Sequence, residues 1–322
     1  MYRIDDATAA TSLPTPEAAG TEGYFTEGNP ATGTPATKVR GSWLNMIQEE
    51  LCAVLAAAGI ARSKTNYNQV NSALQKMYSP VVGAARNLVM SVKSASATAT
   101  LTADQIVVAT ALNGQTFALS NFNKTINLAT TGAGGMDTGS APVSGFVGIY
   151  AIYNPTTGAS ALLATNATAA KVPEVYAGGH MPSGYTASAL VSVVPDNGAA
   201  QFPILNQFDR QVDVVQVGLL GSSTDGGTVW NAIGISGLAP KNAKTFKGYA
   251  AGSNGNAGAF NLGIGGDVNG TGTLTANFSA NGCSCQAAGV PIMTAQTIYW
   301  YYHFSGTVSS LSFQLYGSGY TF

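Results

Sequence analysis

Charged residues are scarce in this chain, and they almost disappear toward its C-terminus. They make up 9% of the 322 residues, against about 25% in an average soluble domain. Residues 248–322 contain one formal charge, Asp267, and one histidine, His303. Acid–base and nucleophilic catalysis need titratable groups held close together, which this segment cannot supply. The composition therefore predicts a protein that is not an enzyme.

The near absence of net charge also argues against several kinds of partner. A formal net charge of −1 gives no electrostatic reason to bind nucleic acid or an anionic membrane surface. No apolar run approaches the roughly 18 residues of a membrane-spanning helix, so we expect no membrane insertion. The first residues lack the apolar core of a secretion signal, and we expect synthesis in a cytoplasm without ordinary secretion.

Residues that hold metals or cofactors are few and are badly spaced for that purpose. Cys283 and Cys285 are separated by one residue, a spacing that strains a disulfide between them. His180 and His303 fall in different expected domains, and no Cys and His cluster completes a zinc site. The glycines in residues 263–266 lack the third glycine of the dinucleotide-binding fingerprint. We therefore expect neither a metal nor a cofactor.

Residues 267–271 admit two interpretations. Oxygen-bearing side chains at alternating positions are typical of a calcium loop, but the bidentate glutamate of such a loop is absent. The Asn269-Gly270 pair is typical of a tight turn. We favour the turn.

Hydrophobic residues reach 45% and aromatic residues 9%, enough to build cores, and the pattern along the chain predicts four regions. Residues 1–40 are rich in proline and glycine and are expected to form an extended arm. Residues 41–82 show helical periodicity, which predicts a short helical collar. Residues 83–222 and 223–322 change to a period of two, which predicts a middle β-domain and a C-terminal head. The expected fold is mainly β, with two β-sandwich-like domains.

The helical collar is expected to contain two helices. Ser42 as N-cap and Gly59 as C′ residue bound the first. Asn66 as N-cap, with Gln69 as its capping-box partner, begins a second that ends at Met77. An apolar stripe with 3-4-3-4 spacing runs along the first helix and consists of Leu44, Ile47, Leu51, Val54 and Ala58. Packing of the two helices as a hairpin and an oligomeric seam along the stripe are about equally expected.

The β regions are divided by turn signals. We expect five to eight short strands in the middle domain and about seven in the head. In the strand at residues 297–304, alternation predicts two aromatic faces. One face carries Ile298, Trp300, Tyr302 and Phe304, and the other carries Tyr299, Tyr301 and His303. Either both faces are covered or one is a binding surface. His303 could help to bind a glycan by stacking and hydrogen bonding, or lie half-buried in an oligomer core.

The charged residues of the β regions include several carboxylates that could serve catalysis. A glycosidase needs two carboxylates at a cleft, and the middle domain offers Asp137, Glu174, Asp196, Asp209 and Asp213. Around Arg210, an exposed ion-paired connector is the simpler interpretation. The lysines at every third position from 241 to 247 favour a solvated edge over an anion site.

The N-terminal segment FTEGNPATGTPATKVRGSWLNMIQEELCAVLAAAGI, residues 25–60, resembles the virion-proximal end of phage and prophage tail fibers. There an extended arm leads into a helix of the Trp-Leu-Asn-x-Ile-Gln-Glu-Glu-Leu type. The segments at residues 84–92, 153–168 and 181–202 are similar to middle domains of such fibers, so the resemblance covers about residues 1–215. The last hundred residues look like a fiber head.

The resemblance implies a homotrimeric tail fiber of the virion, synthesised in the bacterial host cytoplasm. Its N-terminus would dock on tail or adaptor proteins, and its head would bind a bacterial surface receptor, a glycan or an outer-membrane protein. The candidate virion-docking residues are Tyr24, Phe25, Asn29, Pro30, Pro35 and Trp43. The stripe from Leu44 to Ala58 is the candidate trimer seam. A fiber that degrades surface polysaccharide and a structural tail component without a receptor are the alternatives.

Loops at the free end of a rigid β-scaffold can vary without disturbing its core, so receptor contact is expected there. The candidate loops are residues 253–256, 267–271 and 281–286. The second face of the strand at residues 297–304 adds aromatic residues to these loops. The receptor-binding candidates are therefore Asn254, Asn256, Asp267, Asn269, Asn281, Tyr299, Tyr301 and His303.

Overall fold

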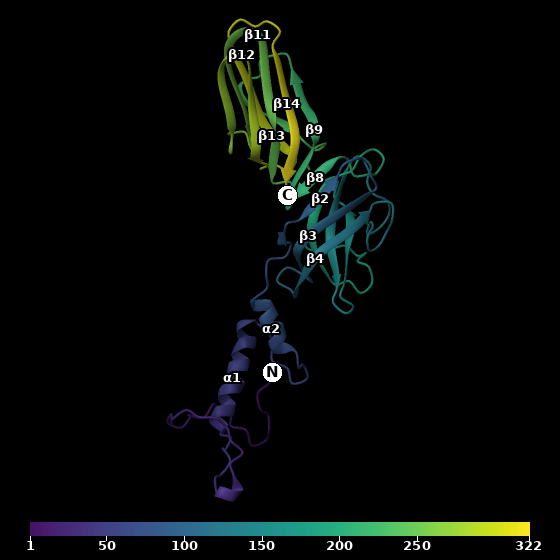
Figure 1. Ribbon diagram of the computed structural model, residues 1–322. Helices are drawn as coiled ribbons and strands as arrows, with labels where there is room; N and C mark the ends of the chain where they lie inside the picture. The colour runs from purple at the N-terminus through teal and green to yellow at the C-terminus, as the bar shows by residue number, and fades with distance from the viewer. The chain divides into compact units, whose positions relative to one another are not determined.

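The computed structural model describes residues 1–322, except for the side chains at 279 and 280. The chain divides into two compact units, Met1–Ser79 and Pro80–Phe322, which are described separately below (Figure 1). Secondary structure is mainly β, as the sequence predicts.

The first unit consists of the arm and two helices. The arm is extended apart from one turn of 3₁₀-helix, η1 (Pro30–Thr32), which Asn29 caps by accepting a hydrogen bond from the Ala31 N–H. The helices are α1 (Gly41–Ala57) and α2 (Gln69–Met77). Proline and glycine at this density favour an extended arm, because proline removes backbone donors, glycine adds conformational freedom, and the segment has no apolar face to bury.

Helix α1 ends where the sequence predicts but does not begin with the predicted cap. Gly59 has a φ of +64°, and the Ile60 N–H donates to the Leu55 carbonyl at 2.9 Å, which is a Schellman ending. At the other end Arg40 occupies the N-cap position without a side-chain hydrogen bond. Ser42 was the wrong choice of cap, because it already lies within the helix and its hydroxyl donates to Glu17 instead.

The predicted start of α2 was wrong by three residues. The Asn66 side chain accepts a hydrogen bond from the Asn68 N–H, so it closes a local turn before the helix rather than capping it. Gln69 is not a capping-box partner. Its buried amide donates to the Ala61 carbonyl and accepts from the Ser63 N–H, tying the loop between the helices to α2.

The two helices pack as a hairpin. On α1 the fully buried contacts are Cys52 and Leu55, and on α2 the buried apolar residue is Ala73. The predicted stripe lies on a neighbouring side of α1 and stays open in the single chain. Leu44 is 54% exposed and Ile47 is 36% exposed.

The second unit begins with nine antiparallel strands within residues 83–222, one more than the upper limit of the prediction, and the first eight are described here. Strands β5, β6 and β7 form one ladder, and β4, β3, β2 and β8 form another. Every residue of β7 except its last is buried. The strands of this part are β1 (Ala85–Arg86), β2 (Val89–Val92), β3 (Thr98–Ala109), β4 (Thr116–Asn127), β5 (Phe146–Asn154), β6 (Ala159–Asn166), β7 (Ala187–Pro195) and β8 (Leu205–Phe208).

The C-terminal part has fewer and longer strands than predicted. After β9 (Gln211–Ser222) it contains five strands, not seven. They are β10 (Gly227–Gly234), β11 (Thr245–Gly265), β12 (Leu274–Pro291), β13 (Thr297–Ser305) and β14 (Ser312–Thr321). The glycines of β11 are not turns. A Cβ at Gly252 would lie 2.8 Å from the Tyr302 ring, and one at Gly258 would overlap the Phe304 ring, so glycine here makes room for aromatic side chains.

A long hairpin of β11 and β12 is shared by two sheets. The first half of β11 pairs with β14, which pairs with β9, and we call this ladder the β9 sheet. The second half of β11 pairs with β13, which pairs with β10, and we call this ladder the β10 sheet. The Phe313 ring of β14 stacks on Trp300 and Tyr302 of β13 at 4.9 and 4.7 Å, so aromatic rings form the core between the two sheets.

The expected boundary at residue 222 is not a linker. Strand β9 pairs with β8 through Gln211 to Val214 and with β14 along most of its length (Figure 1). The buried Tyr320 hydroxyl of β14 also donates to the Val193 carbonyl of β7 at 2.8 Å. The middle and C-terminal strands therefore belong to one compact unit.

Candidate functional site

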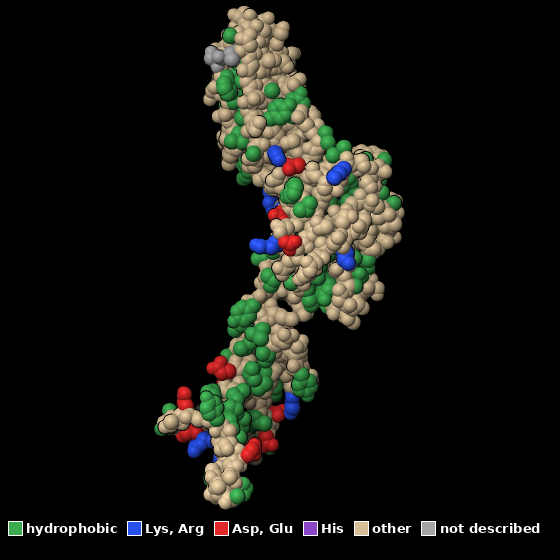
Figure 2. Space-filling view, in the orientation of Figure 1, with side chains coloured by type: hydrophobic (Ala, Val, Ile, Leu, Met, Phe, Trp, Pro, Cys, Tyr) green, Lys and Arg blue, Asp and Glu red, His purple; other side chains and the backbone are tan. Residues whose placement is uncertain are grey.

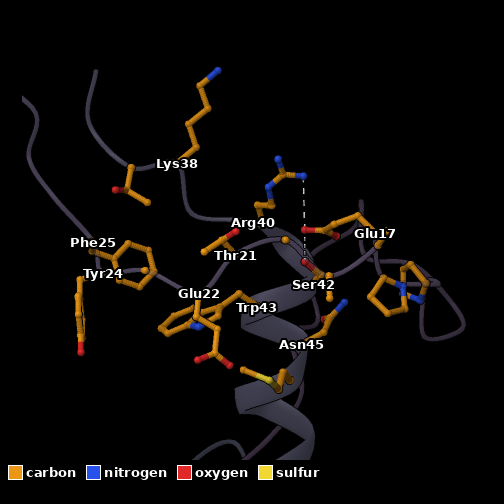
Figure 3. Close-up of a pocket in the computed structure, with 18 of the residues that line it drawn as sticks. Glu17, Thr21, Glu22, Tyr24, Phe25, Lys38, Arg40, Ser42, Trp43 and Asn45 are labelled. Atoms are coloured by element: carbon orange, nitrogen blue, oxygen red, sulfur yellow. Dashed lines mark hydrogen bonds and ion pairs between the residues drawn. The ribbon is translucent and has the colours of Figure 1, made fainter. Parts of the chain in front are cut away.

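The first unit contains a groove between the arm and α1, with a volume of about 860 Å³ (Figure 3). Arm residues 13–25 form one wall. The first turns of α1 form the other, with Trp43 and Met46 on their apolar side. The Phe25 and Trp43 rings meet edge to face, with centroids 5.0 Å apart. An apolar groove that closes on extended backbone is suited to hold a segment of another protein.

Polar contacts hold the arm onto α1 at the groove. Glu17 accepts a hydrogen bond from Ser42 at 2.9 Å and lies 3.4 Å from the Arg40 guanidinium (Figure 3). A hydrogen bond from its own backbone N–H, followed by the hydrogen bond from Ser42 and the charge of Arg40, lowers the pKa of Glu17. Arg3 forms a two-pronged ion pair with Glu49 on the helix, and this pair lowers the pKa of Glu49.

The groove and the predicted seam occupy different sides of α1. Asn45, Met46 and Glu49 line the groove. At 100° per residue they centre on the side roughly opposite the stripe that runs from Leu44 to Ala58. A partner in the groove and a seam along the stripe can therefore coexist.

The groove brings together only part of the predicted docking set. Tyr24, Phe25 and Trp43 line it, and their side chains are exposed, Tyr24 by 99%. Asn29, Pro30 and Pro35 are not among its lining residues, because a backbone pairing of Asn29 with Thr34 folds them into a small turn of their own. The sequence interpretation did not include Leu13 and Met46, which also line the groove.

The outward face of the β10 sheet forms a second candidate site. Alternation along β13 is as predicted, since Ile298 and Tyr302 are buried and Tyr299 and Tyr301 are half-buried. His303 Nδ1 lies 2.9 Å from an Asp225 carboxylate oxygen. The Tyr301 ring meets Trp230 of β10 edge to face at 4.7 Å. The sequence interpretation did not include Trp230 or Asp225 in this site.

Two of the three segments predicted as receptor-binding loops belong to strands instead. Residues 253–256 lie inside β11, and residues 281–286 lie inside β12. Asn254 is only 5% exposed, so it is not an available contact. Asn256 and Asn281 are exposed, but their amides donate to the carbonyls of Thr307 and Gly255.

The third loop is the predicted tight turn. The Asp267 carboxylate accepts hydrogen bonds from the N–H groups of Asn269 and Thr271, and these bonds lower its pKa. Gly270 has a φ of +73°, as an Asn-Gly turn requires. Among the described residues there is no group of three or more His, Cys, Asp or Glu side chains that could hold a metal ion.

The carboxylates of the middle strands are engaged in structural contacts. Glu174 forms a bidentate pair with Arg210, and Asp213 pairs with Lys247 at 2.8 Å. The other three accept hydrogen bonds as follows: Asp137 from the Tyr176 hydroxyl, Asp196 from the Gly145 N–H and Asp209 from the Leu88 N–H. The lysines at 241 and 247 bind separate partners, the Ala169 carbonyl and Asp213, so they do not form a shared anion site.

Charge is distributed unevenly over the molecule. Residues 1–79 contain six Lys or Arg and seven Asp or Glu, nearly half of all charged residues. Figure 2 shows these side chains around the arm and helices, whereas uncharged surface covers the C-terminal strands. Within the described part of the chain, no helix is both long and apolar enough to span a membrane.

Comparison with known proteins gives a partial match. The uncharacterized protein StfP of Escherichia coli strain K12 is 43% identical to this chain over 77 residues. That stretch is 24% of this chain and 35% of StfP, so the chain spans about a third of this relative's length. No family model matches the chain.

Proposed function

We propose that this chain is a tail fiber of a phage or prophage, a virion component that docks on the tail through its N-terminal unit and binds a bacterial surface receptor through its C-terminal strands. The observation that carries the proposal is the 43% identity to StfP over 77 residues. Such a partial relationship points to a side tail fiber protein. The extended arm, the open helix and the nearly uncharged C-terminal strands support the same interpretation.

The docking step rests on the groove beside α1. Tyr24, Phe25 and Trp43 leave large apolar surfaces exposed in the single chain, and such surfaces usually mark a contact with a partner. The arm has no core of its own and gains order only against another surface. Tail or adaptor proteins of the virion are the proposed occupants.

The homotrimer remains part of the proposal and rests on the stripe from Leu44 to Ala58. In the single chain, Leu44 and Ile47 of this stripe are exposed, Leu51 and Val54 are half-buried and Ala58 is buried. Three copies of α1 packed along it would cover Leu44 and Ile47.

Receptor binding without catalysis is the proposed role of the C-terminal strands. Their outward aromatic residues offer contact surface, and the carboxylates of the second unit are committed to hydrogen bonds or ion pairs with its own groups. A degrading enzyme needs two carboxylates available at one cleft. Drops of purified chain on lawns of bacteria test this point, since translucent halos of stripped capsule would contradict it.

The docking proposal is tested by deleting residues 2–39 in the phage genome. We expect particles that lack the fiber, while the truncated chain still appears in the lysate as folded protein. Normal incorporation of the truncated chain into particles would overturn the docking proposal. A matched control is Asn29→Ala, which alters the small turn outside the groove and should leave incorporation unchanged.

A further inference from the structure

The outward face of the β10 sheet carries an ordered row of polar side chains. Asn261 of β11 lies directly opposite His303 of β13 and directly opposite Asn277 of β12. Residues opposite one another on neighbouring strands point to the same face. Since strands lie about 4.8 Å apart, this row of two amides and one imidazole spans about 10 Å.

A second row, rich in aromatic groups, runs beside the first. Gly263 lies opposite Tyr301 and Thr275, and Trp230 adds its ring from β10. Gly263 has no side chain, and a Cβ there would lie 3.0 Å from the Trp230 ring, so the two rings lean across it. Tyr299 follows two residues before Tyr301, opposite Gly265.

Apart from His303, the polar side chains of these rows have no hydrogen-bond partner among the described residues of the chain. The amides of Asn261 and Asn277 and the hydroxyls of Tyr299 and Tyr301 make no hydrogen bond there. His303 is held through Nδ1 by Asp225 at 2.9 Å. In the neutral ring Nδ1 carries the proton and donates, so Nε2 remains an acceptor that faces away from Asp225.

The chemistry of the face selects a particular kind of ligand. Each asparagine amide offers two donors and an acceptor, and each tyrosine hydroxyl offers both functions. A flat protein partner would leave several of these groups buried without hydrogen bonds, which is costly. A sugar can satisfy them with its hydroxyls while its C–H face rests on the aromatic rings. No Lys or Arg lies on β10 or β13 or in residues 254–282, so the face offers no cation to an acidic sugar.

We propose that Asn261, Asn277, Tyr299, Tyr301 and His303 form a binding site for a neutral bacterial surface glycan. This inference rests on the proposed function, since it names the receptor class and the site that binds it. Trp230 and Asp225 act as positioning residues, the first by packing against Tyr301 and the second by fixing the His303 ring.

The test measures binding of the fluorescently labelled full chain to a panel of bacterial strains. Cells are left untreated, oxidised with periodate, which cleaves vicinal diols, or digested with protease. We expect periodate to abolish binding and protease to leave it intact. Polysaccharide extracted from the same cells should compete. Binding that survives periodate but not protease would overturn the glycan assignment and leave the receptor-binding function standing. Absence of binding to every strain would overturn both.

Single substitutions test whether the glycan binds at the proposed face of the β10 sheet. Asn261→Ala and Tyr299→Phe should each weaken binding about tenfold, the effect of one or two lost hydrogen bonds. The matched control is Tyr249→Phe, which removes a hydroxyl from the outward stacked pair of Tyr249 and Tyr316 on the β9 sheet and should leave binding unchanged. Circular dichroism confirms that each variant folds. Glycan binding that is unaffected by the first two variants would overturn the location.

Discussion

Replacing Asn254 with alanine should destabilise the second unit, because this buried side chain fastens the connection between β13 and β14 to β11. Its amide donates to the carbonyls of Asn256 at 2.8 Å and Thr307 at 3.0 Å. Its carbonyl oxygen accepts a hydrogen bond from the Ser309 N–H at 2.7 Å. Asn254 is 5% exposed, so water cannot easily replace these bonds.

The magnitude follows from the three contacts. A net contribution of about 1 kcal/mol for each hydrogen bond gives a loss of about 3 kcal/mol. For a unit of this size, each kcal/mol lowers the melting temperature by about 2–4 °C, so we expect a decrease of about 6–12 °C.

Asn256→Ala is the matched control. Asn256 is exposed, and its amide makes one long bond, 3.3 Å, to the Thr307 carbonyl, so this variant should melt within about 2 °C of the parent chain. Scanning calorimetry of both variants at one protein concentration measures the difference. Equal melting temperatures for the two variants would refute the structural role of Asn254.

Three further predictions concern other parts of the chain. Gln69→Ala should lower the free energy of unfolding of the helical hairpin by about 3 kcal/mol, since three hydrogen bonds are lost, with the Met1 ammonium, the Ser63 N–H and the Ala61 carbonyl; circular dichroism against Gln75→Ala, whose side chain makes no hydrogen bond to the described residues, measures the difference. Burial raises the pKa of Asp196 in the folded state, so stability falls as pH rises from about 4 through the folded pKa. The melting temperature of Asp196→Asn minus that of the parent chain should therefore be larger at about pH 7 than at about pH 4. An equal difference at both pH values would contradict this account. Val54→Glu on the stripe should convert a trimer into monomers in sedimentation experiments, whereas Met46→Glu on the groove side should not; a trimer that persists in the first variant would rule out the seam.

Local signals that need no distant partner were predictable from the sequence. The αL residue Gly59 ends α1 because only a short-range backbone requirement is involved. The continuous apolar run at residues 146–154 became β5, and the alternation at residues 297–304 became the two faces of β13. In each case the signal lies within a few neighbouring residues: a backbone requirement at Gly59, a short apolar run rich in β-branched and aromatic residues in β5, and a period of two in β13.

Signals that depend on distant contacts were not predictable. Gly252 and Gly258 resemble turn residues, but they are glycine because Tyr302 and Phe304 of another strand fill their space. Asn254 resembles a loop residue, yet two of its three hydrogen-bond partners, Thr307 and Ser309, lie more than 50 residues away. Trp230 was missed for the same reason, because its significance depends on Tyr301 lying on the adjacent strand.

The central claim, that this chain is a fiber that binds a bacterial surface through its C-terminal strands, is tested most directly by adsorption competition. Host cells are incubated with purified full chain, and the fraction of phage that remains unadsorbed is then measured by plaque count. We predict that this fraction rises with the concentration of the full chain. The Asn261→Ala variant should need about a tenfold higher concentration to reach the same unadsorbed fraction. Unchanged adsorption at saturating concentrations of the folded full chain would contradict the account.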